Sequence, residues 1–310
     1  MIYRKIKNHS VSTLCFGTAT FVAGKLRPNA NSKIGISALN RAIDKGLNFI
    51  HSNPKLKTQW ATKKVLDKKS PFYKIHHAIK IETPLGEERT KIKNIFTRRL
   101  NSSMKNLGVK FISTIIYEID VKRTHNRNLL HNVKNIKSNF TFIREIFEKA
   151  RRDNKTGLLF CMTHSPLEMR LAINAECFDG LASYFNLIDI WPSYFFDEIY
   201  NKSKNFIGIR PLRHGILTDA FLKSEVYKEN PFICFLNKLQ KEGIWTGALQ
   251  SFAIRFVLAH PVVKSTIVGM STSEHVDELI AAASRSISVE DFRKIVDKIS
   301  GHFKDVDIRS

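Results

Sequence analysis

The sequence predicts an α/β protein, a (β/α)8 TIM barrel in a single domain. Short apolar runs alternate with longer amphipathic segments along the whole chain. The runs lack the polar alternation of strands that face water on one side, which is typical of parallel strands buried on both faces. Eight such strand–helix units close most economically into a barrel of this kind, and a length of 310 residues suits one.

The elements follow one another in the order that a barrel requires. The expected strands lie at 12–16, 47–51, 73–80, 112–118, 157–162, 180–185, 206–210 and 264–269. The expected helices lie at 33–45, 58–67, 87–107, 139–152, 166–174, 194–203, 246–259 and 273–283. We expect one domain over 1–310, with an N-terminal strand region at 1–12 and an extra helix at about 288–300.

An open, doubly wound sheet is the alternative architecture. It would be expected to carry a G-x-G-x-x-G turn after the first strand, where a dinucleotide binds. The first strand is instead followed by FGTATFVAG, which does not have that spacing. The barrel is therefore the preferred fold.

The net charge of +22 is concentrated in one half of the chain. Residues 1–155 hold 33 Lys/Arg and 10 Asp/Glu, whereas residues 156–310 hold 17 and 18. A basic face attracts nucleic acid, anionic headgroups or a phosphorylated substrate, but drift toward Lys, Ile and Asn also explains the bias. Nucleic acid is the partner with the weakest support, because the charge is scattered over several helices and no aromatic-interleaved basic motif is present.

Other sequence features narrow the class of protein. No apolar stretch approaches the ~20 residues of a membrane span, and the N-terminus does not resemble a signal peptide. The four cysteines are scattered without a C-x-x-C pair, which argues against a zinc site and a disulfide framework. We expect a cytoplasmic protein without a membrane partner; the sequence does not define the oligomeric state.

In a barrel, functional groups lie at the carboxyl ends of the strands. Residues 51–56, 162–164, 210–217 and 269–273 lie at such ends, together with Lys80, Glu118 and Ala182. Among them, His51, Lys80 and Glu118 are the candidate catalytic groups, and we expect these three titratable side chains to converge on one mouth.

Several motifs together resemble the aldo-keto reductases. They are CFGTATF, AIDKGLNFIHSN, SSMKNLGVKFISTIIYE, FNLID, RPLRHGILTD and STIVGMSTSEHVDELIAA, and their order and spacing resemble that family over residues 10–285. The resemblance implies a TIM barrel that reduces aldehydes and ketones with NADPH. In the family a tyrosine protonates the nascent alkoxide, a lysine paired with an aspartate lowers the pKa of that tyrosine, and a histidine orients the carbonyl.

The sequence departs from this pattern at the catalytic positions. The aspartate position holds His51, and the tyrosine position holds Leu56, which has no proton to donate. The lysine is retained as Lys80, and the histidine position holds Glu118. Tyr73, Tyr117 and Tyr184 are the remaining candidate phenols; Tyr73 lies at the wrong end of its strand, and alternation turns Tyr117 away from the barrel axis.

The cofactor positions that the resemblance implies are also changed. The Ser-Asn pair that holds the carboxamide reads Met162-Thr163, and the glutamine position is Ala182. The adenine end reads Ser271, His275 and Leu279. The expected cofactor-binding residues are Gly17, Thr18, Leu212, Gly215, Leu217, Gly269, Ser271 and Thr272, which provide a loop and a helix N-terminus that accept phosphate through backbone N–H groups. NADP(H) is the implied cofactor, although the changed positions argue against it.

The candidate site residues each have a simpler structural interpretation. Lys80 and Glu118 form either a catalytic pair or a structural ion pair. Arg210, Arg213 and His164 are candidate anion ligands, and surface ion pairs are the alternative for the arginines. His51, Glu118 and His164 do not have a spacing that demands a metal, and we expect none.

Three functions remain open from the sequence. The first is a barrel that has lost conventional NADPH-dependent reduction and acts on an anionic small metabolite, as a repurposed enzyme or pseudoenzyme. The second is an NAD(P)(H)-dependent oxidoreductase with a rearranged site. The third is a non-enzymatic basic binding module.

Overall fold

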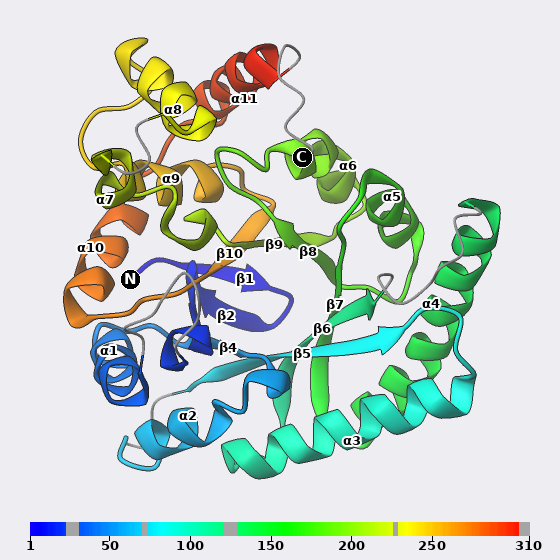
Figure 1. Cartoon of the computed structure of the whole chain (residues 1–310). Helices are drawn as coiled ribbons and strands as arrows, with labels where there is room; N and C mark the ends of the chain where they lie inside the picture. Colours follow the sequence, from blue (N-terminus) through cyan, green and yellow to red (C-terminus); the bar gives the residue numbers. More distant parts are fainter. Residues whose placement is uncertain (23–30, 70–73, 121–128, 226–228, 304–310) are drawn as a thin grey trace.

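Eight parallel strands in the described part of the chain close into a barrel, in the order β10-β3-β4-β5-β6-β7-β8-β9 (Figure 1). The computed structural model describes residues 1–22, 31–69, 74–120, 129–225 and 229–303. The barrel strands are β3 (Leu14–Gly17), β4 (Phe49–Ser52), β5 (His76–Pro84), β6 (Ile112–Asp120), β7 (Thr156–Met162), β8 (Gly180–Tyr184), β9 (Asn205–Ile209) and β10 (Val263–Val268). This is a (β/α)8 barrel in a single domain, as the sequence predicts.

Helices surround the strands on the outside. They are α1 (Ser32–Asp44), α2 (Gln59–Leu66), α3 (Arg89–Leu107), α4 (Leu129–Arg152), α5 (Pro166–Asn174), α6 (Phe196–Asn201), α7 (Asp219–Leu222), α8 (Pro231–Lys241), α9 (Leu249–Leu258), α10 (Ser273–Ala283) and α11 (Val289–Phe303). Short 3-10 turns are η1 (Thr18–Phe21), η2 (Pro54–Leu56), η4 (Trp191–Phe195) and η5 (Arg213–Gly215).

Strand alternation divides the apolar core into two parts. On β6, Ile115 and Tyr117 belong to the large cluster beneath the helices, whereas Ile116 belongs to the cluster inside the barrel. Because successive side chains point to opposite faces, Glu118 shares the inward face with Ile116. The same alternation on β5 places Lys80 inward, two residues beyond the interior Ala78.

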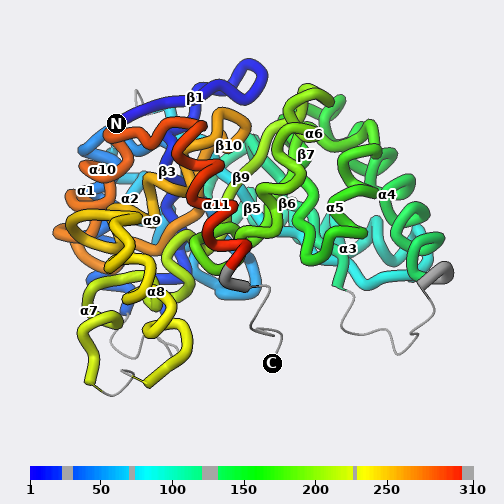
Figure 2. Tube along the Cα trace, turned by 90° about the horizontal axis from the view of Figure 1, so that it is seen from above, coloured from blue at the N-terminus to red at the C-terminus, as the bar shows by residue number. Residues whose placement is uncertain are grey.

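An antiparallel hairpin of β1 (Tyr3–Ile6) and β2 (His9–Ser12) closes the N-terminal end of the barrel. Ile6 and Val11 are buried in the interior cluster. Figure 2 shows the hairpin at one end of the barrel and α7 and α8 at the other. The carboxyl ends of the strands therefore form the open mouth.

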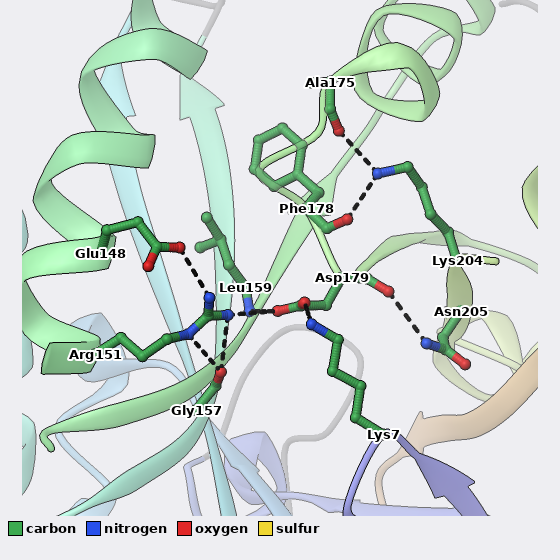
Figure 3. A network of polar contacts seen from close by, with 10 residues as sticks. All are labelled: Lys7, Glu148, Arg151, Gly157, Leu159, Ala175, Phe178, Asp179, Lys204 and Asn205. Carbon is green, nitrogen blue, oxygen red and sulfur yellow. Dashed lines mark hydrogen bonds and ion pairs between the residues drawn. The ribbon is translucent and has the colours of Figure 1, made fainter. Parts of the chain in front are cut away.

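A charged network attaches this hairpin to the barrel (Figure 3). The Asp179 side chain is only 6% exposed and pairs with Lys7 of the hairpin and with Arg151, whose Nη2 lies 3.2 Å away. The backbone N–H of Leu159 also donates to Asp179, at 2.8 Å. A buried carboxylate with this many partners is well compensated.

The sequence predicts the barrel elements better than the segments around them. Each of the eight predicted runs overlaps a strand, but β5 and β6 extend further, to Pro84 and Asp120. Helix α4 begins at Leu129 rather than near 139, and α7 and α8 were not predicted. Tyr73, placed in a predicted strand, lies outside the described residues. These differences concern loops and helix ends, where local patterns are weakest.

Candidate active site

A cavity of about 670 Å³ opens at the mouth of the barrel. Its lining includes these residues singled out from the sequence: Gly17, His51, Leu56, Lys80, Met162, Tyr184, Arg210, Leu212, Gly215, Gly269, Ser271, His275 and Leu279. Within the described ranges, these predicted site residues are not part of the lining: Thr18, Glu118, His164, Arg213, Leu217 and Thr272. The structure thus brings part of the predicted set together around one space.

Lys80 is held between two carboxylates. Its Nζ lies 3.0 Å from Oε1 of Glu82 and also contacts Glu118, and all three side chains are largely buried. Glu82 pairs in addition with Lys55. The sequence indicated the pairing with Glu118 but missed Glu82. The signal was the two-residue spacing of Lys80 and Glu82 on one strand, which places both on one face.

Glu118 connects Lys80 to the loop after β7. Nε2 of His164 lies 2.6 Å from Oε1 of Glu118, and the His164 backbone N–H donates to Glu168 at 2.7 Å. Burial opposes the charged form of Glu118, but the hydrogen bond with His164 and the charge of Lys80 outweigh it, so the pKa of Glu118 is below its usual range. Glu118 is therefore ionised at neutral pH.

His51 faces the cavity as a neutral imidazole. Burial and the neighbouring Lys80 charge lower its pKa to about 4. Among the described residues, neither ring nitrogen of His51 has a hydrogen-bond partner. One N–H donor and one nitrogen acceptor are thus available to a molecule in the cavity.

Leu56 occupies the end of η2, on the loop after β4. The turn begins at Pro54, and the side chain of Asn53 accepts a hydrogen bond from the Lys55 N–H. Leu56 is 38% exposed and lines the cavity. The position where the resemblance requires a tyrosine therefore presents an aliphatic wall.

The phenol of Tyr184 faces this space. The Arg210 guanidinium lies 4.0 Å from the centroid of its ring, and the His164 ring packs against it edge-on with centroids 5.4 Å apart. Burial raises the pKa of Tyr184, while Arg210 opposes that shift. Tyr117, as expected, points away from the axis; it is buried and hydrogen-bonded to Thr83 at 2.7 Å.

The two candidate arginines after β9 have different surroundings. Arg210 lines the cavity, and among the described residues its guanidinium has no ion-pair partner. Arg213 instead pairs with Asp189 at 3.1 Å and lies over the Phe232 ring. The sequence treated these arginines alike, because their different directions depend on loop conformation.

This loop contains an unusual run of left-handed backbone. Arg210, Arg213 and His214 have φ values of 58°, 40° and 58°, and Gly215 follows at 95°. Such values are uncommon outside glycine, and residues held in them concentrate at functional sites. The loop presents Arg210, Leu212, His214 and Gly215 to the cavity.

The cavity matches only part of a nicotinamide dinucleotide. At one side it offers the Arg210–Gly215 loop, and the Ser271 hydroxyl near the N-terminus of α10, which Thr272 caps. At Met162, where the resemblance implies a contact with the carboxamide, and at Ile209 the lining is apolar. The loop and Ser271 suit phosphate groups, and the Met162 side chain offers no hydrogen bond to a carboxamide.

The part of the chain that the structure describes contains neither a metal site nor a membrane span. No three His, Cys, Asp or Glu side chains gather there in a way that would hold a metal ion. None of the helices described is at once long enough and apolar enough to cross a membrane.

Comparison with known proteins agrees with this geometry. The aldo/keto reductase family profile matches residues 182–300. The fold is similar to that of the aldo-keto reductase AKR11C1 from Bacillus halodurans in its holo form, with a TM-score of 0.73, 16% identity and 96% of each chain covered. The profile matches less than half of the chain, and at this identity the structural likeness shows the fold alone. None of the curated proteins matches it.

The family profile covers only the C-terminal part of the barrel. The aldo/keto reductase profile begins at residue 182, after the strands that carry His51, Lys80 and Glu118. The matched part contains the Arg210–Gly215 loop and α10. The loop that carries Leu56 lies outside it.

Proposed function

We propose that this aldo-keto-reductase-like barrel binds a small anionic metabolite at its mouth and has lost conventional NADPH-dependent carbonyl reduction. The observation that carries the proposal is the pair of Leu56, an aliphatic wall at the tyrosine position, and Lys80, held by two carboxylates. Both changes affect the same step, the transfer of a proton to the alkoxide.

Loss of the proton donor alone would disable the family reaction. The reaction needs a general acid whose pKa is drawn toward neutrality, and a neighbouring cation normally does this by favouring the phenolate. Here the charge of Lys80 is compensated by Glu82 and Glu118. The positive field of Lys80 at the cavity is correspondingly weaker. Leu56 also has no hydroxyl group whose pKa this field could lower.

The charges and shape of the cavity favour an organic anion. Arg210 is a cation without an ion-pair partner in the described residues, and a guanidinium binds carboxylate or phosphate through two parallel hydrogen bonds. The neutral His51 adds a donor. Ile116, Met162 and Ile209 make the floor of the cavity apolar. A metabolite with one anionic group and an apolar body complements both the polar groups of Arg210 and His51 and the apolar floor.

The titration properties favour ligand anchoring over acid–base catalysis. A pKa of about 4 makes His51 a weak base at neutral pH, and Glu118 has a lowered pKa and is already bonded to His164 and Lys80. Efficient general acids and bases have pKa values near the working pH. We therefore assign His51 to ligand binding and the Lys80–Glu118 pair to positioning.

In this proposal, only the phosphate groups of NADP(H) have suitable binding partners in the cavity. The Arg210–Gly215 loop and Ser271 suit them, but Glu278 also lines that side of the cavity, hydrogen-bonded to Gln250 at 2.6 Å. We expect weak cofactor binding and no metal. The four cysteines are free thiols, which suits a reducing compartment, and we propose the cytoplasm.

Calorimetric titration tests the anion-binding site with a matched pair of ligands. Phenyl phosphate carries an anionic group on an apolar ring, and benzyl alcohol is a neutral counterpart. We expect phenyl phosphate to bind at least about tenfold more tightly. Equal affinities, or no binding of phenyl phosphate at millimolar concentration, would contradict the proposal.

One observation favours a second candidate, an NAD(P)(H)-dependent oxidoreductase with a rearranged site. The Tyr184 phenol faces the cavity and is packed between Arg210 and His164, and His164 is linked through Glu118 to Lys80. In this second candidate, Tyr184 supplies the proton. The candidate predicts NADPH-dependent turnover by the wild type, and it predicts that Tyr184→Phe abolishes this turnover without changing the affinity for the cofactor.

A further inference from the structure

The outer surface of α3 is basic and contains no acidic residue. Of its 19 residues six are Lys or Arg and none is Asp or Glu. Every exposed position of the helix holds Lys, Arg, Asn, Ser or Thr, side chains that donate hydrogen bonds to phosphate. Its apolar residues Ile92, Phe96 and Leu100 face the barrel. The helix therefore presents about 28 Å of continuous donor surface, at 1.5 Å per residue.

This arrangement is unfavourable for the helix itself. Arg89, Lys91 and Lys93 lie in or next to the first turn, where the helix dipole favours negative charge. Arg89 and Lys93 are four residues apart, a spacing at which like charges destabilise a helix. Glu145 and Glu87 pair with Arg89 and Lys91, but both carboxylates come from outside the helix. Glu87 and the N-cap residue Glu88 precede the helix, but its first turn itself contains no acidic residue.

Neighbouring segments extend the basic surface. Figure 1 shows α2, α3 and α4 side by side along one side of the barrel, and α3 packs against both. Six exposed cations of α2, α3 and the residues just after each have no ion-pair partner in the part of the chain described: Lys64, Lys68, Lys93, Arg98, Lys105 and Lys110. The fold thus collects charges that are scattered in the sequence.

Compositional drift does not explain this surface, because the other side of the barrel lacks it. Helix α10 carries Glu274, Asp277 and Glu278 and no Lys or Arg, and α11 carries three acidic and three basic residues, so neither has an excess of positive charge. Both halves of the chain are rich in the same apolar residues, but the charge excess is confined to residues 1–155.

We propose that the α2–α3 surface binds double-stranded nucleic acid through its phosphate backbone. A surface of cations, amides and hydroxyls satisfies phosphate oxygens without reading bases. Single strands would call for aromatic stacking platforms, and an anionic membrane for apolar side chains beside the charges. None of the exposed large apolar residues of the described chain lies on α3, and α2 adds only Trp60. The proposal is independent of the ligand at the barrel mouth.

Fluorescence anisotropy with labelled 20-base-pair duplexes tests the proposal on the full chain, with DNA and RNA as separate arms. The test variant is Lys93→Ala/Arg98→Ala/Lys105→Ala, three exposed, unpaired cations of α3. The wild type is expected to bind with an affinity that falls steeply with salt. The triple variant should lose at least tenfold in affinity at 100 mM salt. The slope of log K against log salt should become shallower by about 2 to 3, at ~0.9 for each phosphate that is no longer neutralised.

A second triple variant controls for net charge. Lys202→Ala/Lys241→Ala/Arg285→Ala removes three exposed, unpaired cations from the other half of the chain. It should bind the duplexes like the wild type, and circular dichroism should show that both variants fold. Equal losses of affinity in the two variants, no duplex binding at 50 mM salt, or tighter binding to a single strand or to phosphatidylserine vesicles would each overturn the proposal.

Discussion

The two ends of the barrel use charged residues in opposite ways. At the N-terminal end, Asp179 is buried and fully partnered, by Lys7, Arg151 and the Leu159 N–H. At the mouth, Arg210 has no ion-pair partner among the described residues, and the His51 ring makes no hydrogen bond within the same ranges. The closed end stabilises the fold, and the open end can therefore change its chemistry without unfolding the protein.

Other charged side chains at the closed end are also hydrogen-bonded to the protein. The Arg4 guanidinium donates to the Leu258 carbonyl at 2.8 Å, and Lys204 donates to the carbonyls of Ala175 and Phe178 at 2.8 and 2.7 Å (Figure 3 shows the Lys204 contacts). These cations saturate backbone acceptors rather than facing solvent. Replacements at this end should lower stability, whereas replacements at the mouth should lower binding.

The largest expected effect is at the closed end. Asp179→Ala should lower the free energy of unfolding by about 3 kcal/mol, because it removes the buried carboxylate that Arg151, Lys7 and the Leu159 N–H share. Denaturant unfolding measures this. Asp153→Ala is the matched control: it removes an exposed carboxylate 3.7 Å from Lys155 and should cost less than ~1 kcal/mol. Similar costs for the two variants would show that the network does not stabilise the hairpin.

Acid should weaken the closed end before it affects Glu118. Burial above all, with the nearby His9 and Lys74, lowers the pKa of His76 to about 4, from an ordinary value of ~6.5. Between these two pH values the unfolded chain binds a proton that the folded chain does not, so stability falls as the pH drops from 6.5 to 4. The contribution of Glu118, whose pKa is lowered, is lost only below its ordinary value of ~4.3.

Unfolding experiments at several pH values measure this slope. We expect a loss of roughly 2–3 kcal/mol across that window from this histidine, and a shallower slope in His76→Phe, by up to one proton. An unchanged slope in the variant would mean that His76 is not the buried neutral group.

At the mouth, the two arginines of one loop should separate binding from stability. Arg210→Ala is expected to weaken phenyl phosphate binding by about tenfold, or ~1.4 kcal/mol, and to leave unfolding unchanged. Arg213→Ala, which removes the pair with Asp189, should keep the affinity and lower stability slightly. Calorimetry and thermal unfolding on the same samples measure both. Weaker binding in Arg213→Ala together with lower stability in Arg210→Ala would contradict the roles assigned to the two residues.

The smallest effect is expected for Glu118→Gln. Lys80 keeps Glu82 as a partner, so the loss of stability should be only about 1 kcal/mol near neutral pH. The amide keeps the shape but removes the charge that holds His164. Anion affinity should rise slightly, because the mouth loses a negative charge. A stability loss of the size expected for Asp179→Ala would show that charged contacts at the two ends contribute equally to stability.

The sequence predicted the barrel because its signal is periodic and repeated. Eight apolar runs with helices between them leave few topologies, and alternation correctly placed Lys80 inward and Tyr117 outward. The site was predicted only in part. The Lys80–Glu118 pair was confirmed, but its second carboxylate, Glu82, was missed although it is two residues away on the same strand.

The remaining features depend on loop conformation. The left-handed residues between Arg210 and Gly215 separate the directions of Arg210 and Arg213, and local sequence patterns do not specify this because non-glycine residues rarely adopt such φ values. Likewise, the placement of Tyr184 between Arg210 and His164 brings together β8 and the loops after β7 and β9. These contacts arise only when the barrel closes.

The most direct test of the central claim is NADPH oxidation, followed by absorbance, with 4-nitrobenzaldehyde and 9,10-phenanthrenequinone as generic carbonyl substrates. The wild type should show no turnover above the uncatalysed rate, and Tyr184→Phe and Lys80→Ala should not differ from it. Turnover by the wild type that Tyr184→Phe abolishes would contradict the claim and establish Tyr184 as the proton donor.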